Sequence, residues 1–108
     1  MTWLPFLPRF VPYIRAGDKT MTARSKPYGK AGDVLRTPAG PVRLLSVRHV
    51  CLGFVRDFCW DQEGLNSPQE FEEVWRQIHP KAGFDPGRKV YLHHFEHIGE
   101  DEDSGVSG

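Results

Sequence analysis

Short strand-like runs separated by proline and glycine constrain the fold of this chain most strongly. Residues 20–24, 33–37, 42–51 and 89–98 have the residue pattern of strands, and the turn between the second and third is Pro38-Ala39-Gly40-Pro41. Residues 3–6 are predicted to add an edge strand, because prolines exclude this segment from the middle of a sheet. Together these runs predict an α+β fold. We expect a small barrel or strongly curved sheet of about five or six strands, flanked by two or three helices.

Three helical segments complete this prediction. The best-marked helix follows a capping box, Ser67-Pro68-Gln69-Glu70, with proline at the first helical position, and it ends at His79-Pro80. Its apolar stripe, which we expect to pack in the core, consists of Phe71, Val74, Trp75 and Ile78. A shorter helix is predicted over residues 8–16 with Gly17 at its C-terminal cap, and at least one helical turn over residues 55–61.

The length of 108 residues accommodates one domain, which we place at residues 1–98. Residues 99–108 are acidic, rich in glycine and serine, and predicted to be disordered. No apolar run approaches the roughly 20 residues of a membrane span, and the N-terminus lacks the basic region of a signal peptide. We therefore expect a cytoplasmic protein, with a monomer favoured. Its two cysteines, Cys51 and Cys59, are expected to be reduced, and neither a metal nor a cofactor is predicted.

The net charge of zero conceals a strong asymmetry. Residues 1–56 carry ten Lys or Arg and two acidic residues, a net charge of +8. Residues 57–108 carry four basic and twelve acidic residues, a net charge of −8. Because a one-sided positive field attracts anions, we expect RNA or an anionic small molecule as the partner. A solvated basic face without a partner is the alternative.

Several sequence blocks occur in a characteristic order. The first is Ile14-x-x-Gly17-x-Lys19-Thr20-x-Thr22-x-Arg24, and Gly32-Asp33-Val34-Leu35 follows it. Glu63-Gly64-Leu65 then precedes the helix that ends in Trp75-x-x-Ile78-His79-Pro80, and Val90-Tyr91-x-x-x-Phe95 comes last. This pattern, which spans roughly residues 5–98, resembles the ASCH domain, a family of the PUA-like β-barrel superfamily. The resemblance implies a PUA-like barrel, and PUA-like domains generally bind RNA.

The resemblance also implies where a ligand binds. ASCH domains have a cleft beside the segment that corresponds to residues 17–24, so we expect RNA, a nucleotide or a modified nucleoside to bind in a basic cleft there. The residues expected to contact this ligand are Gly17, Thr20, Arg24, Tyr28 and Trp60. Tyr28 and Trp60 would do so by stacking on a base, since both lie in polar or loop surroundings near the motif.

One stand-alone branch of the ASCH family consists of amidohydrolases that remove the acetyl group from N4-acetylcytidine. The catalytic lysine, threonine and glutamate of that branch correspond to Lys19, Thr22 and Glu63. Residues 25–31 and 51–62 do not match the branch. The resemblance thus implies a catalytic set and leaves its substrate open.

Two alternatives follow for these residues. In an amidohydrolase, Thr22 would be the nucleophile, Lys19 the base, and Glu63 the acid that protonates the leaving nitrogen, while Arg24 could stabilise the oxyanion. Lys19 must then be neutral, which costs about 4.6 kcal/mol at pH 7 for an unperturbed lysine, and Glu63 must be protonated or turned away. In a binding module, Lys19 and Arg24 would hold phosphate, and Glu63 would pair with a base edge or with Arg24.

Two other groupings carry less weight. His93, His94 and His97 are close in sequence, but His93 and His94 point to opposite faces of a strand and cannot both bind one metal without distortion. Cys59 could act as a nucleophile only with a base beside it, and the sequence places none there.

Overall fold

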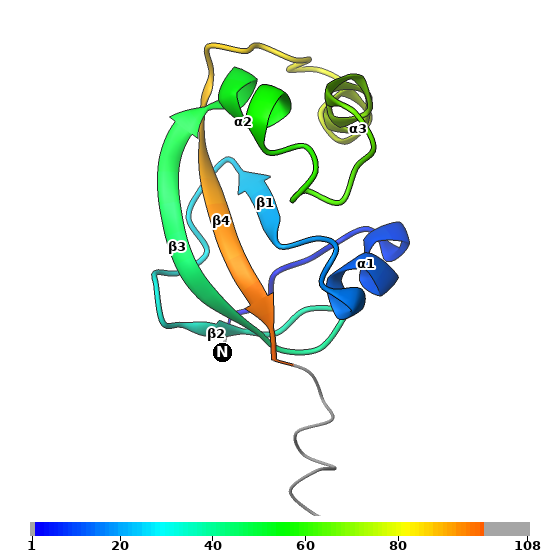
Figure 1. Cartoon of the computed structure of the whole chain (residues 1–108). Coiled ribbons are helices and arrows are strands. Elements are labelled where there is room, and N and C mark those ends of the chain that lie inside the picture. The colour runs from blue at the N-terminus through cyan, green and yellow to red at the C-terminus, as the bar shows by residue number, and fades with distance from the viewer. Residues whose placement is uncertain (1, 99–108) are drawn as a thin grey trace, which may run out of the picture.

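A four-stranded antiparallel sheet, curled into a half barrel, forms the centre of the fold (Figure 1). Its strands are β1 (Met21–Arg24), β2 (Val34–Leu35), β3 (Val42–Cys51) and β4 (Lys89–His97), in the spatial order β1-β4-β3-β2. The computed structural model describes residues 2–98. The predicted acidic tail at residues 99–108 lies outside the described residues.

The central strand β4 determines where β1 lies. Thr22 of β1 and Val47 of β3 both lie opposite His93, one on each side of β4. The register of β3 against β4 shifts between Leu44 and Ser46, which leaves Leu45 as an extra residue. Such a bulge bends its strand and increases the twist, as a curled sheet requires. Within residues 2–98, β1 pairs with β4 alone, so its other edge faces the helices.

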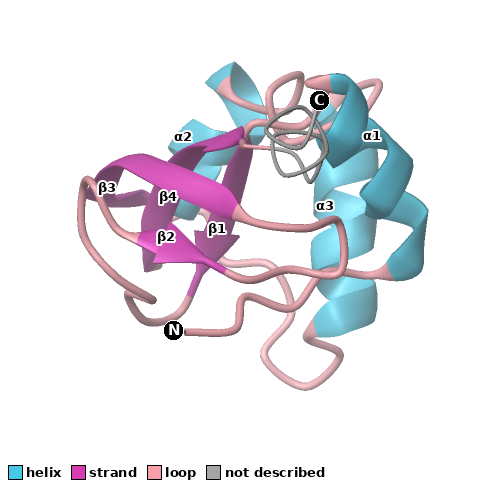
Figure 2. Cartoon of the chain, turned by 90° about the horizontal axis from the view of Figure 1, so that it is seen from below, coloured by secondary structure: helices cyan, strands magenta, loops and turns pink. Residues whose placement is uncertain are grey.

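Three α-helices and one 3-10 turn flank the sheet. The turn η1 (Pro8–Phe10) leads into α1 (Val11–Ala16), and α2 (Leu52–Phe58) follows β3 directly. Helix α3 (Pro68–Ile78) begins after Ser67, whose hydroxyl accepts a hydrogen bond from the backbone N–H of Glu70 at 3.0 Å, as the capping box predicts. In Figure 2, α1 and α3 both lie on the side of the sheet that carries β1, and Figure 1 shows them apart, α3 above β1 and α1 below it.

The predicted α+β architecture is confirmed, with two local differences. Residues 3–6 contribute only an isolated bridge between Trp3 and Arg36, so the described sheet has four strands rather than five or six. Pro5 has no N–H with which to extend the ladder beyond Leu4. The helical turn expected at residues 55–61 is α2, which begins and ends three residues earlier and buries Leu52 fully in the core.

The α3 stripe packs largely as predicted. Phe71, Val74 and Trp75 are buried, whereas Ile78 in the last turn is 49% exposed, so its assignment to the core was wrong. Both cysteines are free thiols, with Cys59 buried. None of the helices within residues 2–98 has the length and the hydrophobicity needed to cross a bilayer.

Candidate ligand-binding pocket

A pocket of about 490 Å³ lies between the outer edge of β1, helix α3 and the segment that precedes α1. Most of its wall is apolar and is formed by Phe6, Phe10, Leu65, Phe71, Val74 and Trp75. Its main polar groups are Lys19, Thr22, Arg24, Lys26, Tyr28 and Glu63. A mostly apolar wall with a few polar groups is typical of small-molecule sites, and this volume falls within their usual range.

The turn after α1 brings Lys19 into this pocket. Gly17 caps α1 in the left-handed conformation with φ of 83°, which glycine adopts without the strain that a Cβ causes. The carbonyl of Tyr13 then accepts hydrogen bonds from the N–H groups of Asp18 and Lys19. The next two N–H groups, those of Thr20 and Met21, donate to the carbonyl of Gln62 at 2.8 and 3.0 Å. These bonds hold Lys19 next to residue 63, which is 44 positions away.

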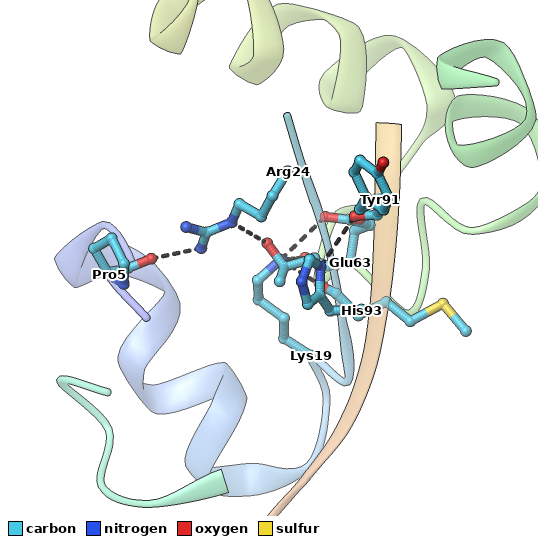
Figure 3. Close-up of polar contacts among 8 residues, drawn as sticks. Pro5, Lys19, Arg24, Glu63, Tyr91 and His93 are labelled. Atoms are coloured by element: carbon cyan, nitrogen blue, oxygen red, sulfur yellow. Dashed lines mark hydrogen bonds and ion pairs between the residues drawn. The ribbon is translucent and has the colours of Figure 1, made fainter. Parts of the chain in front are cut away.

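Lys19 and Glu63 form a buried ion pair. Nζ of Lys19 donates to Oε1 of Glu63 at 3.2 Å, to the backbone oxygen of Glu63 at 2.7 Å, and to that of Met21 at 3.0 Å (Figure 3). The two residues are 3% and 4% exposed. Nζ also lies 4.5 Å from the ring centroid of Phe10. Three acceptors match the three N–H groups of an ammonium, and the aromatic face also attracts a cation, so the geometry favours the charged lysine.

Burial acts against both charges of this pair. It lowers the pKa of Lys19 and raises the pKa of Glu63, while the attraction and hydrogen bond between the two groups partly oppose each shift. Transfer of one proton from Nζ to Oε1 converts the ion pair into a neutral amine and a neutral carboxylic acid. The low-dielectric surroundings therefore bring the neutral pair closer in free energy to the ion pair than it is in water.

Gly64 makes room for the lysine. It adopts φ of 84°, and a Cβ at this position would lie 3.0 Å from Cβ of Lys19 and 3.3 Å from Cγ. Both the conformation and the close approach require glycine. The Glu63-Gly64 dipeptide thus supplies both the carboxylate that pairs with Lys19 and the space for the aliphatic part of the Lys19 side chain.

Arg24 connects Thr22 to the N-terminal segment. Its Nε donates to Oγ1 of Thr22 at 3.1 Å, and its Nη2 donates to the backbone oxygen of Pro5. The guanidinium carbon lies 4.9 Å from the ring centroid of Phe6 and 5.4 Å from that of Tyr28. Glu63 forms its ion pair with Lys19, which corrects the alternative in which Arg24 was its partner. Thr22 Oγ1 accepts a hydrogen bond from the Arg24 guanidinium, so its own hydroxyl hydrogen is available to donate to a base or a ligand.

His93 supports the pocket from the neighbouring strand, a role that the sequence analysis missed. It is fully buried opposite Thr22, and its Nε2 accepts a hydrogen bond from the backbone N–H of Tyr28 at 3.1 Å. Nδ1 lies 3.0 Å from the carbonyl of Tyr91 and must donate to it. These partners specify the neutral tautomer, and burial lowers the pKa of His93 accordingly. Within residues 2–98 no three metal-ligating side chains come together.

Five of the predicted site residues line the pocket: Lys19, Thr22, Arg24, Tyr28 and Glu63. The other three lie outside its lining. Gly17 shapes the turn, Thr20 is held through its backbone by Gln62 and Phe95, and Trp60 packs half-buried against the core. The apolar wall was not predicted, because in sequence a pocket-lining aromatic residue is indistinguishable from a core residue. Nothing in the sequence distinguished Lys26, which lies in a polar loop, as a residue of the pocket.

Comparison with known proteins establishes the fold. No protein-family model matches the chain, and no curated protein matches it. The ASCH domain from Lactobacillus crispatus JV V101 is similar at 14% identity, over 88% of this chain and 79% of that chain, with a TM-score of 0.70. The hypothetical protein PH0355 is similar at 20% identity over 89% and 98% of the two chains, with a TM-score of 0.68. The protein EF3133 from Enterococcus faecalis V583 is similar at 20% identity over 83% and 70%, with a TM-score of 0.62. The expected α+β fold, of the type seen in an ASCH domain, is thereby confirmed.

Proposed function

We propose that this ASCH-type fold binds a nucleoside, a nucleotide or a single unstacked base of an RNA in the pocket beside β1. The observation that carries the proposal is the lining of that one pocket. It combines three cationic side chains, those of Lys19, Arg24 and Lys26, with a single carboxylate and several aromatic rings. Aromatic rings stack on bases, and cationic side chains contact phosphate.

Lys26 is the cation best placed for phosphate. Lys19 is committed to its ion pair with Glu63, and Arg24 already donates to Thr22 and Pro5. Lys26 lines the pocket yet is exposed, and its Nζ lies 5.7 Å from the ring centroid of Tyr28. A base stacked near Tyr28 would therefore carry its phosphate toward Lys26.

Calorimetry with cytidine, cytidine monophosphate and a short single-stranded RNA tests this proposal. Lys26→Ala is expected to weaken binding of the monophosphate and the RNA and to reduce its salt dependence, while leaving cytidine binding unchanged. Lys81→Ala is the matched control, because Lys81 is also exposed and lies outside the pocket lining. Equal effects of the two variants would refute the phosphate contact, and no binding of any of the three ligands would refute the proposal.

A second candidate function is hydrolysis of an N-acyl group on such a ligand. It is favoured by the position of the Lys19–Glu63 pair in the same pocket as the Thr22 hydroxyl. The scheme needs a neutral lysine and a protonated glutamate. One proton transfer within the ion pair produces both at once, and burial lowers the free-energy cost of that transfer.

The reaction then uses each group in turn. Thr22 Oγ1 attacks the acyl carbon and gives its proton to the neutral Lys19. When the tetrahedral intermediate collapses, the C–N bond breaks and Glu63 gives its proton to the leaving nitrogen. Water next attacks the acyl-threonine and loses a proton to Glu63, while Thr22 leaves and takes a proton from Lys19. This restores the neutral pair and releases the carboxylic acid.

Turnover of N4-acetylcytidine, followed by chromatography, tests hydrolysis. Thr22→Val keeps the shape of the side chain and is expected to lower kcat by a factor on the order of 10³ or more. Thr22→Ser retains a hydroxyl and should keep part of the activity. Unchanged turnover in Thr22→Val, or no turnover by the wild type at high enzyme concentration, would exclude this reaction and leave the binding proposal standing.

A further inference from the structure

Trp75 combines deep burial with an unused hydrogen-bond donor. The residue is 5% exposed, and its indole Nε1 has no hydrogen-bond partner within residues 2–98. A buried indole N–H normally has an acceptor, and leaving such a donor unpaired costs about 1–3 kcal/mol. Because Trp75 lines the pocket, an acceptor on a bound ligand could recover this free energy.

The ring of Trp75 is held in a defined orientation. Its neighbours at i−4 and i+4 are Phe71 of α3 and His79, the residue that follows the end of α3. The His79 ring stacks on it with centroids 4.2 Å apart and planes at 29°, and the Phe71 centroid lies 6.2 Å away with planes at 25°. The guanidinium carbon of Arg88 lies 6.0 Å from the ring. These contacts keep the N–H in one direction, so a ligand would not have to order it.

The complementary acceptor in the same pocket is Glu63. Its Oε1 accepts from Lys19, whereas its Oε2 makes no hydrogen bond of normal geometry within residues 2–98. The backbone N–H of Ala23 is near enough to lower the pKa of the carboxyl group, although it forms no hydrogen bond of normal geometry with Oε2. Among the described side chains, the two buried polar atoms without partners are therefore one donor and one acceptor, and both of their residues line this pocket.

We infer that Trp75 binds ligand: its indole N–H donates to a carbonyl oxygen of a planar heterocycle, and Glu63 Oε2 accepts from an N–H of the same ligand. This inference rests on the proposed nucleoside binding and specifies its chemical class. The ligand carries an amide group whose C=O and N–H are both free to form hydrogen bonds, as in uracil or in an N-acylated cytosine. Since both protein atoms are covered in the structure, neighbouring side chains must shift as the ligand enters.

The indole N–H resonances of the ¹⁵N-labelled protein test this contact directly. The chain has three tryptophans, Trp3, Trp60 and Trp75, and the resonance lost in Trp75→Phe identifies the third. Uridine and N4-acetylcytidine are the probes. The Trp75 indole proton is expected to move downfield on titration with a binding probe, while those of Trp3 and Trp60 stay in place. Trp75→Phe keeps an aromatic ring and should raise Kd about 3- to 10-fold, the equivalent of one hydrogen bond.

Trp60→Phe is the matched control, because it removes the same group outside the pocket lining and should leave Kd within about twofold. A probe that binds the wild type while the Trp75 resonance stays fixed and Trp75→Phe keeps its affinity would overturn the inference and leave the proposed function intact. If neither probe nor any other nucleoside binds the wild type, the proposed function fails and the inference fails with it. Should Trp75→Phe not fold, Trp3→Phe and Trp60→Phe assign the Trp75 resonance by elimination, and the titration decides.

Discussion

Replacing Lys19 with methionine tests the energetics of the pocket directly. Methionine has a similar length and no charge, so Lys19→Met leaves the carboxylate of Glu63 buried without its cation. At 3.2 Å and an effective dielectric constant of about 20, the lost attraction is about 5 kcal/mol before the lysine's own desolvation is relieved. Removing one partner of a buried ion pair typically costs about 3–5 kcal/mol net.

Protonation of Glu63 limits this cost and makes it depend on pH. An unperturbed glutamate has a pKa of about 4.3, so neutralising it costs about 3.7 kcal/mol at pH 7 and about 1 kcal/mol at pH 5. Burial raises the pKa of Glu63 in the folded state, and losing Lys19 removes the main opposing influence. When folding raises the pKa of a carboxyl group, the free energy of unfolding keeps its full value below the pKa of the unfolded state. It then falls as the pH rises toward the pKa of the folded state. Lys19→Met should therefore cost roughly 4 kcal/mol at pH 7 and roughly 1 kcal/mol at pH 5.

Urea unfolding at pH 5, 6 and 7 measures this difference against the wild type at each pH. The double variant Lys19→Met/Glu63→Gln has no titrating carboxyl at this position and should show no such pH dependence. Arg43→Met is a surface control: it removes an ion pair with Glu96 whose side chains are 46% and 51% exposed, and should cost less than about 1 kcal/mol. An equal loss for Lys19→Met at pH 5 and pH 7 would show that Glu63 is not the uncompensated charge.

Three further predictions concern the surroundings of the pocket. Gly64→Ala is expected to lower the free energy of unfolding by at least about 1–2 kcal/mol, measured by thermal unfolding, because alanine is strained at positive φ and its Cβ would crowd Lys19. The control is Gly32→Ala, also at positive φ but with open space around it, which should show the conformational cost alone. Ser67→Ala removes the oxygen that caps α3 and should cost about 1 kcal/mol, a loss that Ser67→Asn should largely avoid, and equal losses in both variants would contradict this role. Burial lowers the pKa of His93 in the folded protein, so the free energy of unfolding should have its full value above the unfolded pKa of about 6.5. Below that pH it should fall by up to about 1.4 kcal/mol per pH unit. If His93→Gln loses stability just as steeply at low pH, another group is responsible.

The elements that could be predicted from sequence are those that depend on neighbouring residues. The start of α3 followed from the Ser67 hydroxyl, which lies three positions before the N–H of Glu70 that it caps. The end of α1 followed from Gly17, which tolerates positive φ. Strand positions followed from local residue patterns. Ile78 shows the limit of this approach: its spacing matched the buried stripe, but the last turn of α3 extends beyond the core and leaves the side chain half exposed.

Contacts between distant segments could not be obtained in this way. The resemblance to ASCH domains pointed to Lys19, Thr22 and Glu63, but it did not pair them. The alternative pairing of Glu63 with Arg24 was equally compatible with the sequence. It fails because the Arg24 guanidinium donates to Thr22 and Pro5, whereas Glu63 pairs with Lys19. Trp60 was as plausible a stacking residue as Tyr28 until the fold placed one outside the pocket lining and the other within it.

The sequence by itself therefore determined the turn that ends at Lys19, the polar groups carried by residues 19–24, and the basic charge of the first half of the chain. Tertiary structure alone decided that Lys19 has three acceptors, that burial shifts its pKa and that of Glu63 in opposite directions, and that Trp75 is left with an unused donor. The physical reason is that pKa shifts and unsatisfied hydrogen bonds depend on distance and burial. Both are set by which remote segments the fold brings together.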